Sequence, residues 1–330
     1  MEKMRMPNKA PVFSVCMVTY NHENYIKNAI ESVISQKHKY SYELIISDDC
    51  SKDKTPDIIR KYAEKYPSII KPIYNKKNLG AMKNYYQALS KCKGTYILFC
   101  DGDDFWEQGK VKTQVSFLEN NIDFDFVYSK MQMFNPDNIR IGELGYNAES
   151  VYDVFKANPV PSSTLCFRSK IWKTYYNQIK PEQQPWLMED FPFVLFLFNN
   201  CKHYFFNEYQ AHYNVIENSL SHQKNIKKSF LFSQNVQVIK KFFAEFYKMD
   251  IRIHTDKEVF KDCTNSLLKS NSSAMRKEAY ELYNELHLND FFLLLRCKNL
   301  FTNYLSRFIN ITKKVLRAVT PYAVIKKIEK

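Results

Sequence analysis

The first hundred residues alternate between short apolar runs and amphipathic stretches, and this alternation restricts the possible folds more than any other feature. The apolar runs have the length and β-branched content of buried strands. The stretches between them place apolar residues on one half of a helical wheel. Strands that alternate with helices indicate a parallel sheet with right-handed crossovers. We therefore predict an α/β fold with a Rossmann-like, mostly parallel sheet flanked by helices. The predicted strands are 12–20, 42–49, 68–74 and 95–104, and the predicted helices are 24–36, 55–65 and 81–92.

The rest of the chain divides into a mixed region and a helical region. Short strands are predicted near 126–134, 163–168 and 203–215, with a helix at 188–199. From Ile226 onward the apolar residues have helical spacing, which predicts a C-terminal helical annex. A chain of 330 residues is long enough for about two domains. The expected division is an N-terminal extension at 1–10, a sheet domain at 11–223 and a helical region at 224–330 that ends in a basic amphipathic tail.

Polar clusters follow each of the first four predicted strands. In chain order they read TYNHEN, SDDCSKD, NKKNLGA and DGDD. In sheets of this kind, ligands bind at the carboxyl ends of the strands. We therefore expect the four clusters to meet at one edge of the sheet and to form a ligand site there.

The DGDD cluster at 101–104 carries the strongest chemical signal. Carboxylates at alternate positions of a turn can share a hydrated divalent cation, and Gly102 allows the backbone to bend between them. With 16 Asp in 330 residues, about one D-x-D pattern is expected by chance, and a second one occurs at 123–125. That second pattern precedes a strand, as acids of solvated loops do, whereas DGDD follows an apolar strand. Its position therefore favours 101–104 as a site for a metal and a phosphate.

Three further candidates lie at the ends of predicted elements, and the two acid pairs among them also allow a structural interpretation. Asp48 and Asp49 end a predicted strand, where they can cap the next helix or accept a hydrogen bond from a nucleobase or ribose. Tyr20 ends the first strand and can lie against the same base with its ring face. Glu189 and Asp190 begin a helix, where they can complement the helix dipole or provide a carboxylate base opposite the metal.

Two weaker signals accompany these candidates. The NLGA segment at 78–81 enters a helix and can present backbone N–H groups to a phosphate. His212 and His222 flank the segment YNVIENSLS, and an isolated histidine is more often a surface or core residue than a ligand.

Five blocks of this sequence, in their order and spacing, resemble family 2 glycosyltransferases with the GT-A fold. The blocks are SVCMVTYNHENYIKNAIESVISQ, YELIISDDCSKDKT, NLGAMKNYYQAL, GTYILFCDGDDFW and WLMEDFPF, and the resemblance extends over residues 11–222. It implies a nucleotide-diphosphate sugar as donor, a divalent metal (Mg or Mn) as cofactor and inversion at the anomeric carbon.

The resemblance also implies roles for individual residues. Asp103 matches the metal ligand, and Asp190, the last acid of MED, matches the catalytic base. YNVIENSLSH looks like the closing segment of the family, which supports His222 as a further metal or diphosphate contact. The residues expected around the nucleotide sugar are Thr19, Tyr20, Glu23, Asp48, Asp49, Asp101, Gly102 and Asp104.

The implied reaction moves one sugar to a hydroxyl of a glycan or lipid-linked acceptor, in surface polysaccharide biosynthesis. The Q-x-x-R-W motif of processive synthases is absent from the sequence, which argues for a single addition. Two alternatives remain open. A sugar nucleotidyltransferase would share the sheet and the acids but would require a loop rich in Gly, Arg or Lys after the first strand, where TYNHENY has no Gly or Arg. A non-catalytic nucleotide-sugar-binding protein would require the acids to be incidental.

The cysteines and the apolar segments bear on the cellular location. Eight Cys are scattered without a C-x-x-C pair, as is typical of reduced core residues. The longest apolar run, FPFVLFLF at 191–198, is shorter than the roughly 18 residues that a spanning helix needs. The N-terminus has no small-residue cleavage site, so we expect a cytoplasmic chain.

The formal net charge of +13 is concentrated near the C-terminus, where residues 291–330 hold nine Lys or Arg and one acid. Over 304–319 the apolar residues fall on one side of a helical wheel and the basic residues on the other. This pattern predicts a helix that lies on an anionic membrane, at the inner face of the plasma membrane, and the alternative is a helix packed on the protein itself. The expected partners are thus the sugar donor, the acceptor and an anionic membrane surface, with no nucleic acid.

Overall fold

The computed structural model describes residues 10–216, 225–267, 273–290, 293–294 and 297. Contacts divide the chain into two compact units. The first comprises the residues up to 216 together with 239–251, and the second comprises 217–238 together with the residues from 252 onward. The expected domain boundary at residue 223 stays a prediction, and His222 and the tail at 304–319 lie outside the described residues.

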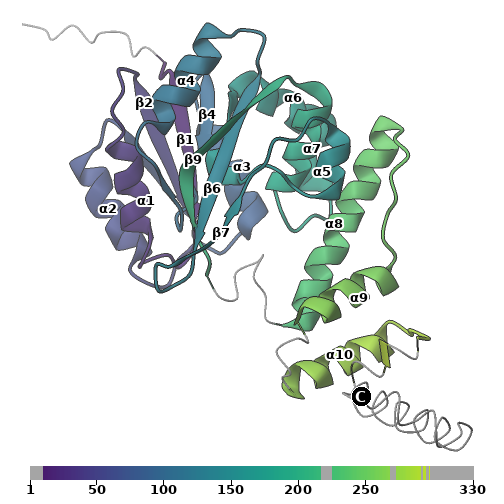
Figure 1. Cartoon of the computed structure of the whole chain (residues 1–330). Helices are drawn as coiled ribbons and strands as arrows, with labels where there is room; N and C mark the ends of the chain where they lie inside the picture. Colours follow the sequence, from purple (N-terminus) through teal and green to yellow (C-terminus); the bar gives the residue numbers. More distant parts are fainter. Residues whose placement is uncertain (1–9, 217–224, 268–272, 291–292, 295–296, 298–330) are drawn as a thin grey trace, which may run out of the picture. The chain divides into compact units, whose positions relative to one another are not determined.

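The first unit is built on one twisted sheet with helices packed against it (Figure 1). The strand order is β3-β2-β1-β4-β8-β6-β9-β5, and β7 pairs with β6 at the side of this path. The strands are β1 (Phe13–Thr19), β2 (Tyr42–Asp48), β3 (Ile70–Tyr74), β4 (Tyr96–Phe99), β5 (Phe105–Trp106), β6 (Phe126–Phe134), β7 (Arg140–Leu144), β8 (Cys166–Arg168) and β9 (His203–Asn214).

The first four strands form the predicted parallel part of the sheet. β1 pairs in parallel with β2 and β4, and β2 pairs in parallel with β3. The connecting helices are α1 (Ile26–Ile34), α2 (Thr55–Lys65) and α3 (Ala81–Lys91). The predicted alternation of strands and helices is therefore confirmed. β4 ends at Phe99, earlier than predicted, so DGDD lies in the loop beyond this strand.

The second half of the sheet makes it mixed. β8 is antiparallel to both β4 and β6, β5 is antiparallel to β9, and β6 and β9 run parallel. The strand predicted at 163–168 is shorter than expected, because its first residues form a 3-10 turn, η1 (Ser162–Thr164). The remaining helical elements of this unit are α4 (Lys110–Asn120), α5 (Val151–Lys156), α6 (Ser169–Ile179), η2 (Pro181–Gln183) and α7 (Asp190–Asn200).

The core of the first unit lies between the sheet and its helices. Alternate residues of β1, Phe13, Val15 and Met17, are fully buried and belong to the same apolar cluster as Ile26 and Ile30 of α1. Burial of each such side chain stabilises the fold by about 1.5–3 kcal/mol. This packing fixes the direction of β1 and therefore the position of the loop at its carboxyl end.

The second unit is helical, as predicted for the C-terminal annex. It contains the first part of α8 (Ile226–Tyr247), α9 (Asp256–Leu267) and α10 (Ser273–Glu285). Its own apolar cluster includes Ile226, Phe230 and Phe260. Within the described part of the chain, the helices lack the combination of length and apolar character that crossing a membrane requires.

Candidate active site

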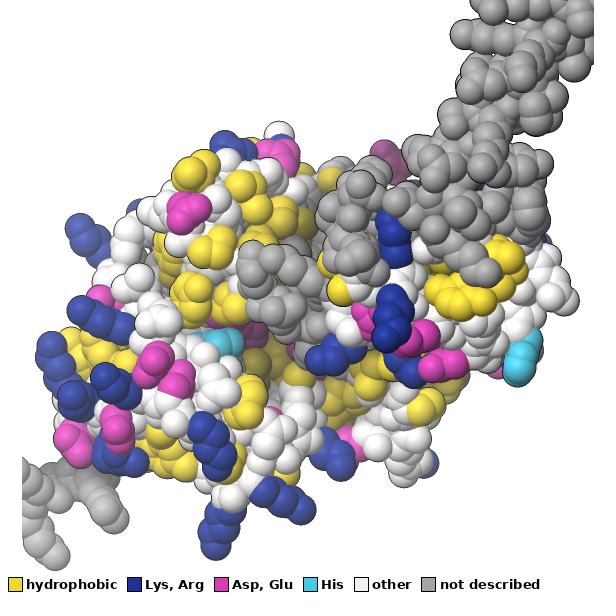
Figure 2. Space-filling view, turned by 90° about the horizontal axis from the view of Figure 1, so that it is seen from below, with side chains coloured by type: hydrophobic (Ala, Val, Ile, Leu, Met, Phe, Trp, Pro, Cys, Tyr) yellow, Lys and Arg dark blue, Asp and Glu magenta, His cyan; other side chains and the backbone are white. Residues whose placement is uncertain are grey.

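The loops after β1, β2 and β4 meet at the carboxyl edge of the sheet, as predicted. The N–H of Asp49 donates to the carbonyl oxygen of Thr19 at 2.9 Å, and the N–H of Gly102 donates to that of Val18 at 2.9 Å. These bonds continue the parallel ladder beyond the strands. Figure 2 shows the lower face of Figure 1, where a histidine and acidic side chains lie in a hollow.

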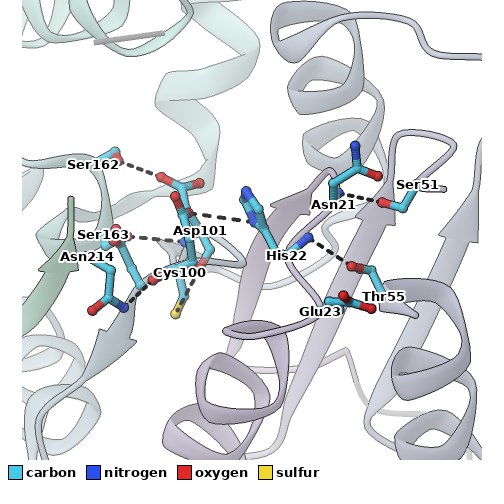
Figure 3. Close-up of polar contacts among 12 residues, drawn as sticks. Asn21, His22, Glu23, Ser51, Thr55, Cys100, Asp101, Ser162, Ser163 and Asn214 are labelled. Atoms are coloured by element: carbon cyan, nitrogen blue, oxygen red, sulfur yellow. Dashed lines mark hydrogen bonds and ion pairs between the residues drawn. The ribbon is translucent and has the colours of Figure 1, made fainter. Parts of the chain in front are cut away.

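The loop after β1 is tied to the loop after β2 (Figure 3). Asn21 has a left-handed backbone with φ of 56°, a conformation that Asn tolerates better than most residues. Its N–H donates to Oγ of Ser51 at 2.8 Å, and the N–H of His22 donates to Oγ1 of Thr55 at 2.9 Å. The sharp turn at Asn21 therefore places His22 at the edge of the sheet, beside the DGDD loop.

Two of the residues predicted at the nucleobase bind groups of the loops after β2 and β3. The carboxylate of Asp48 accepts hydrogen bonds from the hydroxyl of Ser51 at 2.5 Å and from its N–H at 3.2 Å. The carboxylate of Asp49 accepts from the N–H groups of Leu79 at 2.8 Å and Gly80 at 2.9 Å. The NLGA segment thus gives these two N–H groups to Asp49, and a phosphate contact of this segment stays a prediction. A contact of either acid with a base stays a prediction.

The other residues predicted at the nucleotide differ in their surroundings. Thr19 is buried, and its Oγ1 has no hydrogen-bond partner among the described residues. Tyr20 is 44% exposed at the end of β1, so its ring is open to a ligand. Glu23 accepts a hydrogen bond from the N–H of Lys54 at 3.0 Å, which gives it a structural part in the loop after β2.

Gly102 allows the DGDD loop to approach the end of β1. A Cβ at this position would lie 2.7 Å from Cβ and Oγ1 of Thr19 and 3.1 Å from Nδ1 of His22. A glycine is therefore required at position 102 because two loops approach each other closely there. The sequence suggested a different reason, a bend of the backbone between the acids. Nδ1 of His22 lies 3.8 Å from Oδ1 of Asp103.

The other two acids of DGDD are held by serines. The hydroxyl of Ser162 donates to Oδ2 of Asp101 at 2.9 Å, and the hydroxyl of Ser163 donates to Oδ2 of Asp104 at 2.6 Å (Figure 3). Burial, and next the nearby charge of Asp103, raise the pKa of Asp101 to about 7. The same two causes raise the pKa of Asp104 well above its ordinary value. Within the described residues, Oδ1 of both acids is shielded from solvent and has no hydrogen-bond partner.

The acids of MED belong to the same site. Asp190 is the first residue of α7, and its Oδ2 accepts a hydrogen bond from Nδ2 of Asn158 at 3.2 Å. Burial, followed by the charges of Asp190 and Asp101, raises the pKa of Glu189 to about 8. The charge of Asp190 also contributes to the raised pKa of Asp101. The structure therefore brings the DGDD and MED acids together across 85 residues of sequence, since Asp104 and Glu189 differ by that number of positions.

The second D-x-D pattern lies elsewhere and has a structural role. Oδ2 of Asp125 accepts a hydrogen bond from the N–H of Lys202 at 3.1 Å, and the carbonyl oxygen of Lys202 accepts from the N–H of Asp125 at 2.8 Å. These bonds hold the start of β9 against β6. This geometry agrees with the choice of 101–104 over 123–125.

Several residues at the site carried no recognisable sequence signal. They include Ser162, Ser163, Asn158 and Asn214, whose Nδ2 donates to the carbonyl oxygen of Asp103 at 2.5 Å. His212, considered as a ligand, lies between the rings of Phe105 and Phe134 and pairs with Glu107. Its contacts therefore agree with the structural interpretation.

The carboxylate oxygens of the DGDD loop determine whether this site can hold a metal ion. The described residues contain no group of three or more His, Cys, Asp or Glu side chains placed to hold a metal ion on their own. They do contain the carboxylate of Asp103 and the unpartnered Oδ1 atoms of Asp101 and Asp104. Mg²⁺ is commonly bound by one or two carboxylates together with substrate phosphates, so these oxygens fit a metal that arrives with a phosphate ligand.

The family of the chain follows from comparison with known proteins. Residues 14–182 match the model of the family described as glycosyl transferase family 2, so the chain belongs to this family, and the assignment made from the sequence blocks is confirmed.

The curated relatives include one that is named a glycosyltransferase. The chain is 33% identical over 131 residues to an uncharacterized protein of Mycobacterium tuberculosis, a match that covers 39% of this chain and 38% of that protein. It is 32% identical over 222 residues to the putative teichuronic acid biosynthesis glycosyltransferase TuaG of Bacillus subtilis, a match that covers 66% of this chain and 85% of TuaG. The chain thus spans less than two thirds of the mycobacterial relative and most of TuaG.

Solved structures confirm the predicted GT-A type of α/β fold. The mannosyltransferase PcManGT from Pyrobaculum calidifontis, solved with GDP-Man and Mn²⁺, has a TM-score of 0.53 at 14% identity over 97% of this chain and 84% of that chain. Residues 1–349 of S. aureus TarS, solved with UDP-GlcNAc, have a TM-score of 0.53 at 16% identity over 88% of this chain and 91% of that chain. At such identities the similarity concerns the fold alone.

Proposed function

We propose that this chain is a metal-dependent, inverting glycosyltransferase that transfers one sugar from a nucleotide-diphosphate sugar to a hydroxyl of a glycan or lipid-linked acceptor. The observation that carries the proposal is the meeting of the DGDD and MED acids at the carboxyl edge of a parallel sheet, with raised pKa values at Asp101 and Glu189. Family membership and the similarity to TuaG, a putative teichuronic acid biosynthesis glycosyltransferase, support a place in surface polysaccharide assembly.

Asp103 is the proposed ligand of a divalent metal, Mg or Mn, and His222 is a proposed further contact. The metal, when bound, supplies positive charge that stabilises the departing diphosphate. Asp101, Gly102 and Asp104 would bind the nucleotide sugar beside it. The unpartnered carboxylate oxygens of the two acids support this assignment, since buried charged oxygens without partners are costly.

Asp190 is the proposed catalytic base. Asn158 donates a hydrogen bond to Oδ2 of Asp190, and the carboxylate would accept the proton of the acceptor hydroxyl. Loss of this proton allows the hydroxyl oxygen to attack the anomeric carbon from the face opposite the leaving group, which gives inversion. Burial raises the pKa of Asp190 above its ordinary value, which suits a group that must accept a proton.

The nucleoside is proposed to lie at the ends of β1 and β2, where Thr19, Tyr20, Glu23, Asp48 and Asp49 occur. The exposed ring of Tyr20 supports stacking on a base. Asp48 already binds its own loop and Asp49 binds the segment before α3, so part of their contribution would be to shape the base pocket.

The experiment has two stages. A thermal-shift panel of nucleotide sugars with Mn²⁺ identifies the donor, because a ligand that binds the folded state raises the melting temperature. The identified donor, radiolabelled, is then incubated with the full-length protein. Release of a nucleoside diphosphate supports glycosyl transfer. Formation of a nucleoside triphosphate and a sugar 1-phosphate, only when pyrophosphate is added, would identify a nucleotidyltransferase and contradict the proposal. Stabilisation by no donor in the panel together with no turnover would also contradict it.

A further inference from the structure

The turn η1 contributes a hydroxyl to each of two acids in the DGDD loop. Ser162 donates to Oδ2 of Asp101, and Ser163 donates to Oδ2 of Asp104. Ser163 also accepts a hydrogen bond at Oγ from the N–H of Asp101 at 3.1 Å, so one side chain connects both acids. Figure 3 shows the two serines on one side of Asp101 and His22 on the other.

These bonds select which oxygen of each carboxylate remains for a ligand. Oδ2 of Asp101 and of Asp104 is occupied by a serine, while Oδ1 of each is shielded and has no partner among the described residues. Two carboxylate oxygens without partners in one buried loop are unfavourable unless something binds them. A hydroxyl that holds one oxygen also fixes the rotation of the carboxylate and hence the direction of the other oxygen.

A buried polar network binds the backbone carbonyl oxygens of η1. The carbonyl oxygen of Thr164 accepts hydrogen bonds from Nζ of Lys110 at 3.0 Å and from Nε2 of Gln114 at 2.8 Å. The carbonyl oxygen of Ser163 accepts from Nε1 of Trp106 at 3.0 Å. Lys110 is 1% exposed and Gln114 is 0% exposed, and Nζ of Lys110 also donates to Oε1 of Gln114 at 2.5 Å. Burial of a lysine among neutral oxygens is costly for stability, so a positional role explains this arrangement better than a stabilising one.

We infer that η1 is a positioning element of the donor site, in which Ser162 and Ser163 orient Asp101 and Asp104 toward the metal and diphosphate of the donor. This inference rests on the proposed function and adds two residues that the family blocks of the sequence do not contain. The serines act through the two acids and are positioning residues, not catalytic ones. Lys110 and Gln114 keep the backbone of the turn in place.

The test compares four serine variants of the full-length protein. Ser163→Ala and Ser162→Ala each remove one hydroxyl, whereas Ser162→Thr retains it at a partly buried position. Ser129→Ala is the matched control, because Ser129 is fully buried and donates only to the neighbouring carbonyl oxygen of Lys130. Calorimetry measures binding of Mn²⁺–UDP and, separately, of Mn²⁺–GDP, and the melting temperature is recorded without ligand.

A hydrogen bond to a charged group contributes enough to change affinity by roughly tenfold to a hundredfold. We expect each alanine variant at η1 to bind its Mn²⁺–nucleotide complex more weakly by about this factor. Ser162→Thr should restore binding to within about twofold, and Ser129→Ala should bind as the wild type does. Loss of affinity in the η1 variants without a matching loss of melting temperature separates positioning from a general effect on the fold.

Two results would overturn the inference, and they differ in what they mean. If the wild type binds a complex and the η1 alanine variants bind it equally well, the inference fails while the proposed function stands. If the wild type binds neither complex and also releases no nucleoside diphosphate from any donor, the proposed function fails and the inference fails with it.

Discussion

Neutral donors hold three of the acids of the site. A hydroxyl holds Asp101 and another holds Asp104, and the amide of Asn158 holds Asp190. In the described part of the chain, Nδ1 of His22 lies 3.8 Å from Oδ1 of Asp103. Burial is the largest cause that raises the pKa of Asp101 to about 7, and the charges of Asp103 and Asp190 in this cluster of carboxylates raise it further. Such a cluster favours a bound cation.

Replacement of the Asp190 carboxylate by a carboxamide tests whether Asp190 is the catalytic base. We expect Asp190→Asn to lower kcat by about a hundredfold or more while donor binding stays within about twofold, because a carboxamide cannot accept the proton. Glu189→Gln should lower kcat less. Steady-state kinetics at saturating substrate and calorimetry with donor check both parts, with Glu182→Gln, at an exposed acid, as the control. Turnover of Asp190→Asn close to the wild-type rate would show that another group takes the proton.

A methyl group at Gly102 tests the close approach of the two loops. Gly102→Ala places Cβ 2.7 Å from Oγ1 of Thr19, so we expect the variant to lose about 1–3 kcal/mol of unfolding free energy and to bind donor weakly. Gly142→Ala is the control, because its Cβ would meet only Sδ of Met133 at 3.6 Å. Urea denaturation of both variants measures the difference. Equal stability of the two would contradict the packing described at the site.

At the scale of elements, the parallel half of the sheet could be predicted from sequence and much of the other half could not. β1, β2 and their helices have strong periodicity, and α2 occupies the residues that were predicted for it. β5 has only two residues, and β7 is largely exposed, so neither has an apolar pattern to detect. DGDD was found by its position after a strand. η1 was not predicted, because a turn of three residues has no periodic signal.

The network behind η1 predicts a specific pH dependence of stability. Burial lowers the pKa of Lys110 to about 7, whereas an unfolded chain has an ordinary lysine with a pKa near 10.4. Between these values the unfolded state binds a proton that the folded state does not, so the contribution of Lys110 to stability rises with pH. From pH 7 to pH 9 we expect the wild type to gain about 2 kcal/mol of unfolding free energy relative to Lys110→Met.

Urea denaturation at the two pH values measures this difference. Lys112→Met, at an exposed lysine of the same helix, is the matched control and should show the pH profile of the wild type. Parallel profiles for the wild type and Lys110→Met would mean that Lys110 keeps an ordinary pKa in the folded protein.

At the scale of the whole molecule, the uneven charge predicts where the protein docks. Eight of the thirteen net positive charges fall within residues 291–330. A basic residue near an anionic surface contributes about 1 kcal/mol, so these charges suffice for peripheral binding. We expect the full-length protein to float with anionic vesicles at physiological salt and a chain that ends at Asn303 to remain in the pellet fraction. Neutral vesicles are the control. Equal flotation of the two chains would show that the residues after Asn303 are not needed for membrane binding.

A comparison of the two D-x-D patterns tests the proposed metal site at Asp103 most directly. Asp103 lies at the proposed metal site. Asp125 instead accepts a hydrogen bond from the N–H of Lys202 and holds the start of β9 against β6. Calorimetry with Mn²⁺ and the identified donor measures affinity in Asp103→Asn and Asp125→Asn. The account predicts that Asp103→Asn loses most metal-dependent donor binding, and that Asp125→Asn binds as the wild type does. Equal responses of the two variants, or donor binding that is unchanged by a chelator, would contradict it.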